Sequence, residues 1–101
     1  MNGCNREKSL VSIQRRIATF SGTVQGVGFR YTACRVAEAF DVAGYVRNLP
    51  DGDVEVVAEG EQGEIDRFLE QLGRQMRGYI VRMTQQTAPH QAEFQGFRVR
   101  F

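Results

Sequence analysis

The stretch VQGVGFRY, residues 24–31, marks the point at which a strand-like pattern gives way to a helical one. Its first five residues contain Gly26 and Gly28 but no Ser, Thr, Asp or Asn, and Arg30 follows them. The first N–H groups of a helix have no acceptor within the helix, and a side chain of one of those four kinds usually caps them. We therefore expect this junction to leave backbone donors free for a ligand.

The chemistry of the junction suits an anion. Glycines let the backbone approach a ligand closely, the helix dipole adds positive potential, and the planar guanidinium of Arg30 matches the oxygens of a phosphate. A bound phosphate would then supply the missing cap. The competing interpretation is that a glycine simply caps the helix and that Arg30 is an ordinary surface charge, because a lone Gly-x-Gly is weak evidence.

Hydrophobic periodicity on both sides of the junction predicts the other elements. Apolar residues recur at helical spacing from Phe29 to Phe40 and again in EIDRFLEQLGRQM, residues 64–76. The predicted order is a strand over 16–24, a helix over 29–40, strands over 43–48 and 53–60 joined by the turn LPDG, a helix over 64–76, and strands over 79–84 and 97–101 that flank a polar loop over 85–96.

This order predicts an α+β fold of the ferredoxin-like, split βαβ type, β-α-β-β-α-β with an extra terminal strand. Both helices then cover one face of a mixed sheet, and the other face meets solvent. The third strand supports this arrangement, because Val54, Val56 and Ala58 alternate with Glu55 and Glu59. We expect one apolar face and one wet face.

A second polar residue is expected near the glycine loop. Side chains alternate along a strand, so if Val46 faces the helices, Asn48 lies on the same side at the exit of its strand. Asn48 would then offer a neutral amide beside the anion site. The alternative is that Asn48 only initiates the turn that follows it.

Length and charge restrict the classes of function. A chain of 101 residues suffices for one domain with a modest core. Thirteen Lys and Arg against 12 Asp and Glu create no overall field that would concentrate nucleic acid or a membrane surface. Lys8 is the only lysine, which argues against Schiff-base chemistry and a Walker-type lysine. We therefore expect neither a nucleic-acid nor a membrane partner.

The amino-terminal stretch is polar and contains no apolar signal-peptide core. We interpret residues 1–14 as a flexible tail and residues 15–101 as the single domain. Cys4 in the tail and Cys34 in a helical stripe make a weak case for a disulfide. We expect two free thiols, a reducing cytoplasm and a monomer.

At the glycine loop the sequence resembles the acylphosphatase family. The family signature Gly-x-Val-Gln-Gly-Val-x-Phe-Arg matches residues 22–30, and a second stretch, Arg or Lys then Asn followed by a Gly-x-Val-Glu strand, matches Arg47-Asn48 and residues 52–55. The likeness extends over residues 16–101. It departs from the family in two places. Family members commonly have a Gly-Pro turn where this chain has residues 76–79, and residues 1–15 precede the position at which the family sequences usually start.

The resemblance implies hydrolysis of an acyl phosphate to a carboxylate and inorganic phosphate, without metal or cofactor. It implies that the phosphoryl oxygens are bound by Arg30 and by the backbone amides of Gln25, Gly26, Val27, Gly28 and Phe29. It also implies that Asn48 positions the attacking water.

The residues themselves agree with that chemistry. Arg30 does not exchange a proton near neutral pH and Asn48 does not titrate, so the site holds no general acid for a poor leaving group. The carboxylate released from an acyl phosphate needs none, because its conjugate acid has a pKa of about 4 to 5. Phosphate monoesters, which release alkoxides, are disfavoured.

Other chemistries have little support. His90 is the only histidine and lies in the predicted polar loop, which argues against a triad or a histidine metal site. Cys34 lacks a CxxC partner or a histidine to activate it, and we interpret it as a packing residue.

Two rival functions keep the same fold. An RNA-recognition domain would carry a glycine-aromatic signature on a central strand, whereas here the signature precedes a helix, and Glu55 and Glu59 would repel phosphates from the open face. The other rival is a phosphate-binding domain that has lost turnover, against which Arg30 and Asn48 argue.

Overall fold

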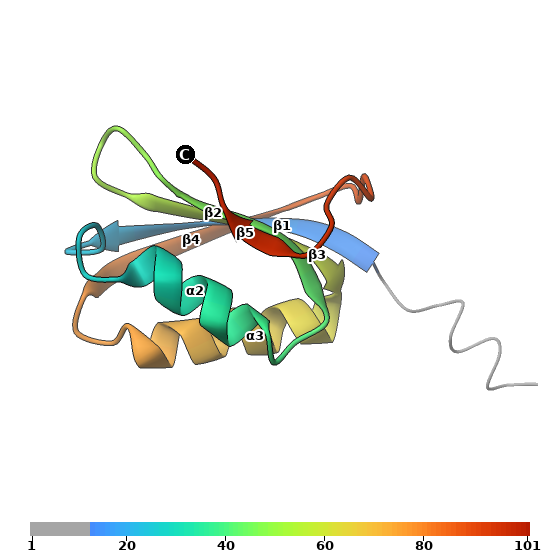
Figure 1. Cartoon of the computed structure of the whole chain (residues 1–101), viewed down its shortest axis with the longest axis horizontal. Coiled ribbons are helices and arrows are strands. Elements are labelled where there is room, and N and C mark those ends of the chain that lie inside the picture. The colour runs from blue at the N-terminus through green and yellow to red at the C-terminus, as the bar shows by residue number, and fades with distance from the viewer. Residues whose placement is uncertain (1–12) are drawn as a thin grey trace, which may run out of the picture.

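The computed structural model describes residues 13–101, which form a five-stranded sheet with two helices on one face (Figure 1). The elements are β1 (Ile13–Gly22), α2 (Phe29–Ala37), β2 (Val42–Asn48), β3 (Val54–Glu61), α3 (Gln62–Gln75), β4 (Ile80–Ala88) and β5 (Phe97–Val99). The strand order is β4-β1-β3-β2-β5, antiparallel except for the parallel pair β2 and β5. The predicted ferredoxin-like α+β fold is confirmed.

Some boundaries differ from the sequence prediction. β1 begins at Ile13, so residues 13 and 14 of the predicted tail pair with β3. β4 continues to Ala88 and shortens the predicted polar loop, because Arg15 of β1 pairs with Ala88. Strand pairing thus extends both strands past the point where the local pattern fades. The rest of the predicted tail, with Cys4, lies outside the described residues.

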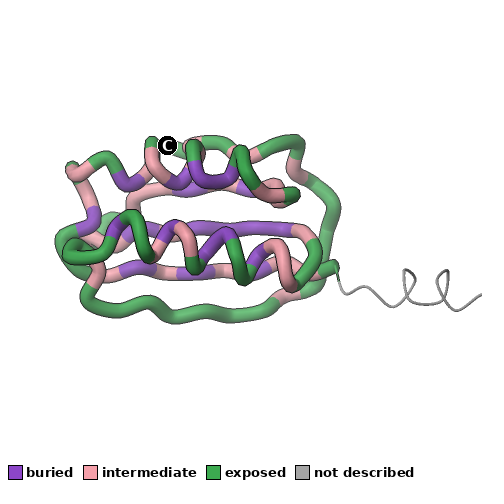
Figure 2. Tube along the Cα trace, turned by 90° about the horizontal axis from the view of Figure 1, so that it is seen from below, coloured by how far each residue is buried: buried purple, intermediate pink, exposed green. Residues whose placement is uncertain are grey.

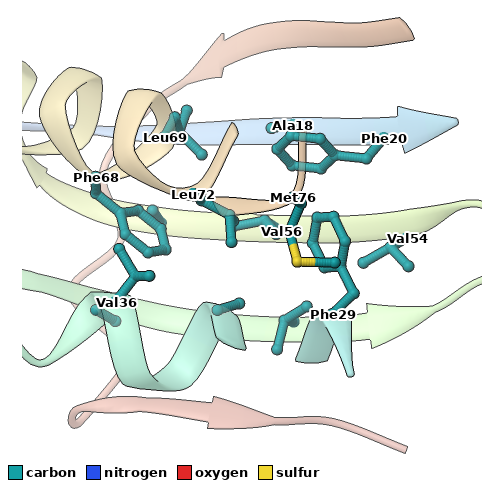
Figure 3. Packing of buried hydrophobic residues seen from close by; sticks show 14 of the residues in the cluster. Ala18, Phe20, Phe29, Val36, Val54, Val56, Phe68, Leu69, Leu72 and Met76 are labelled. Carbon is teal, nitrogen blue, oxygen red and sulfur yellow. The ribbon is translucent and has the colours of Figure 1, made fainter. Parts of the chain in front are cut away.

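The core lies between the helices and the inner face of the sheet. The helical stripe of α3 places Phe68, Leu72 and Met76 over the buried residues of the central strands, and α2 adds Phe29 and Val36 (Figure 3). Burial runs along the facing sides of helices and strands, whereas the edge strand β4 is largely exposed (Figure 2). No helix within residues 13–101 is long and apolar enough to cross a membrane.

The outer face of the sheet is not uniformly wet, which corrects the expectation for Glu59. This residue is only 5% exposed, because the segment after β4 folds back over it. Its carboxylate accepts hydrogen bonds from Arg15 Nε at 2.8 Å and from the backbone N–H groups of Gln91 and Ala92 at 2.9 and 3.1 Å. His90 Nε2 lies 3.8 Å from the same carboxylate, so this histidine is not simply solvated. Glu59 therefore fastens the segment to the sheet.

The hydrogen bonds also set the titration of Glu59. Burial opposes ionisation, but the bonds from Gln91 and Arg15 and the charges of Arg15 and His90 outweigh it and lower the pKa of Glu59 below its ordinary 4.5. Since the pKa is lower in the folded state, the carboxylate contributes fully to stability above pH 4.5. That contribution is lost as the pH falls through the folded-state value.

We predict that Glu59→Gln lowers the free energy of unfolding by about 1–3 kcal/mol at neutral pH, because the largely buried Arg15 loses one of its two carboxylate partners. The variant should also lose less stability than the wild type between about pH 5 and pH 3. Urea unfolding across this pH range measures both effects. Glu70→Gln, at an exposed carboxylate of α3, is the control and should change little. Equal pH slopes for Glu59→Gln and the wild type would contradict the assignment.

Candidate active site

The loop between β1 and α2 places two glycines in the left-handed region. Gly26 and Gly28 have φ angles of 80° and 79°, in the left-handed region that glycine adopts without a steric penalty. Gly28 is the N-cap of α2 and no side chain caps the helix. The first helical bond runs from Thr32 N–H to Gly28 O at 2.9 Å. The N–H groups that precede Thr32 in the helix have no helical acceptor and are available to a ligand.

The side chain of Gln25 ties this loop to the turn between β2 and β3. Its Nε2 donates to the carbonyl oxygens of Leu49 and Asp53, each at 2.8 Å. The same turn is closed by Leu49 N–H donating to Asp53 O at 2.8 Å. Because Asn48 directly precedes this turn, the Gln25 amide fixes the end of β2 beside the glycine loop.

A hollow of about 350 Å³ lies where the loop, the end of β2 and β5 meet. It brings together five of the predicted residues, Gly26, Gly28, Phe29, Arg30 and Asn48. Its other lining residues are Val24, Tyr31, Cys34, Val99 and Phe101.

Two predicted site residues, Gln25 and Val27, do not line the hollow. The Gln25 side chain is turned toward the β2–β3 turn, and Val27 packs against the core. Phe29 contributes no side-chain surface for a polar ligand, because its ring is 2% exposed and lies 5.0 Å from the ring of Phe20. For these three residues any role toward a phosphate falls to the backbone N–H.

The hollow combines one cation with apolar surface. Arg30 is its cation, with its guanidinium carbon 5.3 Å from the ring centroid of Phe101, and none of its described lining side chains is acidic. Burial, with a smaller effect of the Glu38 charge, raises the pKa of the Cys34 thiol. The thiol is therefore protonated near neutral pH and is a poor nucleophile. Within residues 13–101, no three side chains of His, Cys, Asp or Glu gather in a way that could hold a metal ion.

The model of one protein family, Acylphosphatase, matches residues 17–99. The chain belongs to the acylphosphatase family. Curated acylphosphatases from Acaryochloris marina and Archaeoglobus fulgidus are 51% identical over 53 residues and 57% identical over 49 residues. These alignments cover 52% and 48% of this chain, and they span only 57% and 55% of those relatives.

Solved acylphosphatase structures share the fold over most of the chain. The crystal structure from Bacillus subtilis has a TM-score of 0.78 at 30% identity and covers 89% of this chain and 100% of its own. The structure from Coxiella burnetii has a TM-score of 0.77 at 34% identity and covers 87% and 93%. A full-length HypF structure is 23% identical with a TM-score of 0.73, where 91% of this chain matches 12% of the HypF chain, and this likeness shows the fold alone.

Sequence reasoning missed the wall that β5 contributes to the hollow. Val99 and Phe101 reach the site because β5 pairs in parallel with β2, where Val46 aligns with Val99. No local signal identifies this pairing, since the partners are more than 50 residues apart. Tyr31 also lines the hollow, and its position directly after Arg30 in the sequence does not indicate this.

We predict that Gln25→Glu lowers the free energy of unfolding by about 1–3 kcal/mol near neutral pH. The carboxylate has no N–H to donate and faces the carbonyl oxygens of Leu49 and Asp53. Lowering the pH toward about 4 should recover part of the loss, because a protonated carboxyl donates one bond. Gln86→Glu, the same change on the exposed strand β4, is the control for denaturant unfolding at both pH values. Equal stability of the two variants would show that the amide does not hold the turn.

Proposed function

We propose that this protein hydrolyses acyl phosphates to a carboxylate and inorganic phosphate, with the phosphate held by Arg30 and the 25–30 loop amides and the water positioned by Asn48. The observation that carries the proposal is the shared hollow, in which an uncapped helix start, one arginine and one neutral amide face a common space. Membership of the acylphosphatase family supports the same conclusion.

The binding step uses fixed positive potential. The free N–H groups at the start of α2 and the guanidinium of Arg30 donate to the phosphoryl oxygens, and both favour the extra negative charge of the transition state. Because the glycine loop is tied to the β2–β3 turn through Gln25, these donors are already in place before substrate arrives.

In the chemical step, the water held by the Asn48 amide attacks phosphorus in line with the departing oxygen. The bond between phosphorus and the carboxyl oxygen breaks, and the carboxylate leaves with the electron pair. The proton of the water passes to an oxygen of the phosphate itself. No general acid is required, because a carboxylate is a stable leaving group at neutral pH.

The apolar wall of the hollow is suited to the acyl group. Tyr31, Cys34, Val99 and Phe101 present apolar or weakly polar surface next to Arg30. An acyl chain can lie against this wall while its phosphate faces the loop. The proposal also includes independence from metals, since the charge that stabilises the phosphoryl group comes from Arg30 and backbone dipoles.

Free phosphate should compete with substrate and raise the melting temperature, because it binds the folded loop and not the unfolded chain. Calorimetric titration with inorganic phosphate gives the affinity, and hydrolysis of acetyl phosphate with and without EDTA tests the need for a metal. Undetectable phosphate binding at millimolar concentration by folded protein would count against the site. Loss of turnover in EDTA that a divalent metal restores would count against the metal-independent mechanism.

Arg30→Ala and Asn48→Ala should impair different steps, phosphate binding and turnover in the first and turnover alone in the second. Removing Arg30 should weaken phosphate binding by about 1.5–3 kcal/mol and also reduce turnover, because a charge-assisted hydrogen bond is lost. Removing Asn48 should leave phosphate affinity nearly unchanged while kcat falls by roughly two to three powers of ten. Arg35→Ala, one turn away on the exposed side of α2, is the matched control. An Asn48→Ala protein that turns over at the wild-type rate would refute the assigned role of this residue.

A further inference from the structure

A second hollow lies on the opposite face of the sheet from the candidate active site. Side chains of β5 and its continuation alternate: Val99 and Phe101 face the helices, whereas Arg98 and Arg100 face outward beside Tyr45 of β2. This outer hollow has a volume of about 360 Å³. Its lining residues are Gly44, Tyr45, Glu93, Phe94, Gln95, Gly96, Arg98, Val99 and Arg100.

In this hollow the flat surfaces of two aromatic rings and a guanidinium group meet and form a corner. The rings of Tyr45 and Phe94 meet edge to face, with centroids 5.8 Å apart and an interplanar angle of 74°. The guanidinium carbon of Arg100 lies 3.9 Å from the Tyr45 ring centroid, which is stacking distance. Aromatic rings and stacked guanidinium planes are the surfaces on which proteins hold nucleobases.

The carboxylates near the corner all have arginine partners. Glu55 accepts from Arg47 Nε at 2.7 Å and from the Tyr45 hydroxyl at 3.2 Å. Glu59 and Glu93 share one partner, Arg15, so this group keeps one net negative charge. Pairing therefore weakens the repulsion of phosphates expected from Glu55 and Glu59 but does not abolish it.

Arg98 and Arg100 remain as uncompensated cations. Within residues 13–101, no carboxylate forms an ion pair with either of them, and both are exposed. They occupy the same face two residues apart, so both guanidinium groups can reach one phosphate. Aromatic surface and phosphate-binding charge thus lie together in one hollow.

We propose that this outer hollow is a binding site for a mononucleotide, with the phosphate on Arg98 and Arg100 and the base in the corner formed by Tyr45 and Phe94. A single nucleotide fits better than a strand of RNA or DNA. Polymer binding draws on many phosphate contacts, whereas this hollow offers two unpaired cations and the whole chain carries a net charge of only +1. The site is independent of acyl phosphate hydrolysis.

Calorimetric titration of the full chain with AMP tests the proposal, and the same titration of Arg30→Ala shows whether the loop at the start of α2 contributes. AMP should bind at one site, at least tenfold more tightly than ribose 5-phosphate, which lacks the base, or adenosine, which lacks the phosphate. Arg98→Ala and Arg100→Ala should each weaken AMP binding about tenfold or more, since each loses a charge-assisted bond. Arg82→Ala, an exposed arginine on the far edge strand β4, is the matched control and should bind as the wild type does. Melting temperatures near that of the wild type confirm that the variants are folded.

The absence of binding at millimolar AMP would overturn the proposal, and so would any of three other results. The first is AMP binding that Arg98→Ala and Arg100→Ala leave unchanged. The second is AMP binding that is lost in Arg30→Ala, which would place the nucleotide in the phosphate loop. The third comes from a single-stranded RNA hexamer: affinity far above that of AMP, with a steep salt dependence, would identify a strand-binding surface instead. A hexamer that binds no more tightly than AMP supports the mononucleotide site.

Discussion

Two hydrogen bonds from the amide of Gln25, to the carbonyl oxygens of Leu49 and Asp53, join the two halves of the candidate active site. The glycine loop follows β1 and the amide of Asn48 ends β2, and these strands are not neighbours, because β3 lies between them. The sheet alone therefore brings the two groups only to the same end of the fold. The Gln25 side chain, which spans from the loop to the turn, sets their relative position.

The site consists largely of backbone. Gly26 and Gly28 hold the loop in a conformation open to a ligand, and α2 begins without a side-chain cap. Arg30 and Asn48 add charge and orientation but no proton exchange near neutral pH. Such a site can stabilise a phosphoryl group and direct a water, but it cannot protonate a leaving group. Such a site suits only reactions in which the leaving group departs as a stable anion. Acyl phosphates meet this requirement, because they release a carboxylate.

The short strand β5 gives the two faces of the sheet different chemistry. Strand alternation places Val99 and Phe101 in the wall of the candidate active site and Arg98 and Arg100 on the outer face. The outer face also buries Glu59 beneath the segment that leads from β4 to β5. The sequence predicted a sheet face that simply meets solvent. In the structure this face contains an ion-pair network and, beside it, arginines that form no ion pair within residues 13–101.

The sequence by itself determined the order of the elements, the uncapped helix start and the identity of Arg30 and Asn48 as its polar companions, because glycine placement, capping residues and hydrophobic period are local properties. It could not determine the wall formed by Val99 and Phe101, the burial of Glu59 or the lengths of β1 and β4. Those features arise from the pairing of β5 with β2, from the return of the 89–96 segment over the sheet and from the pairing of β1 with β3 and β4. Each joins residues 30 or more positions apart, and a contact at that separation leaves no trace in the local pattern because packing of the whole sheet decides which strands become neighbours.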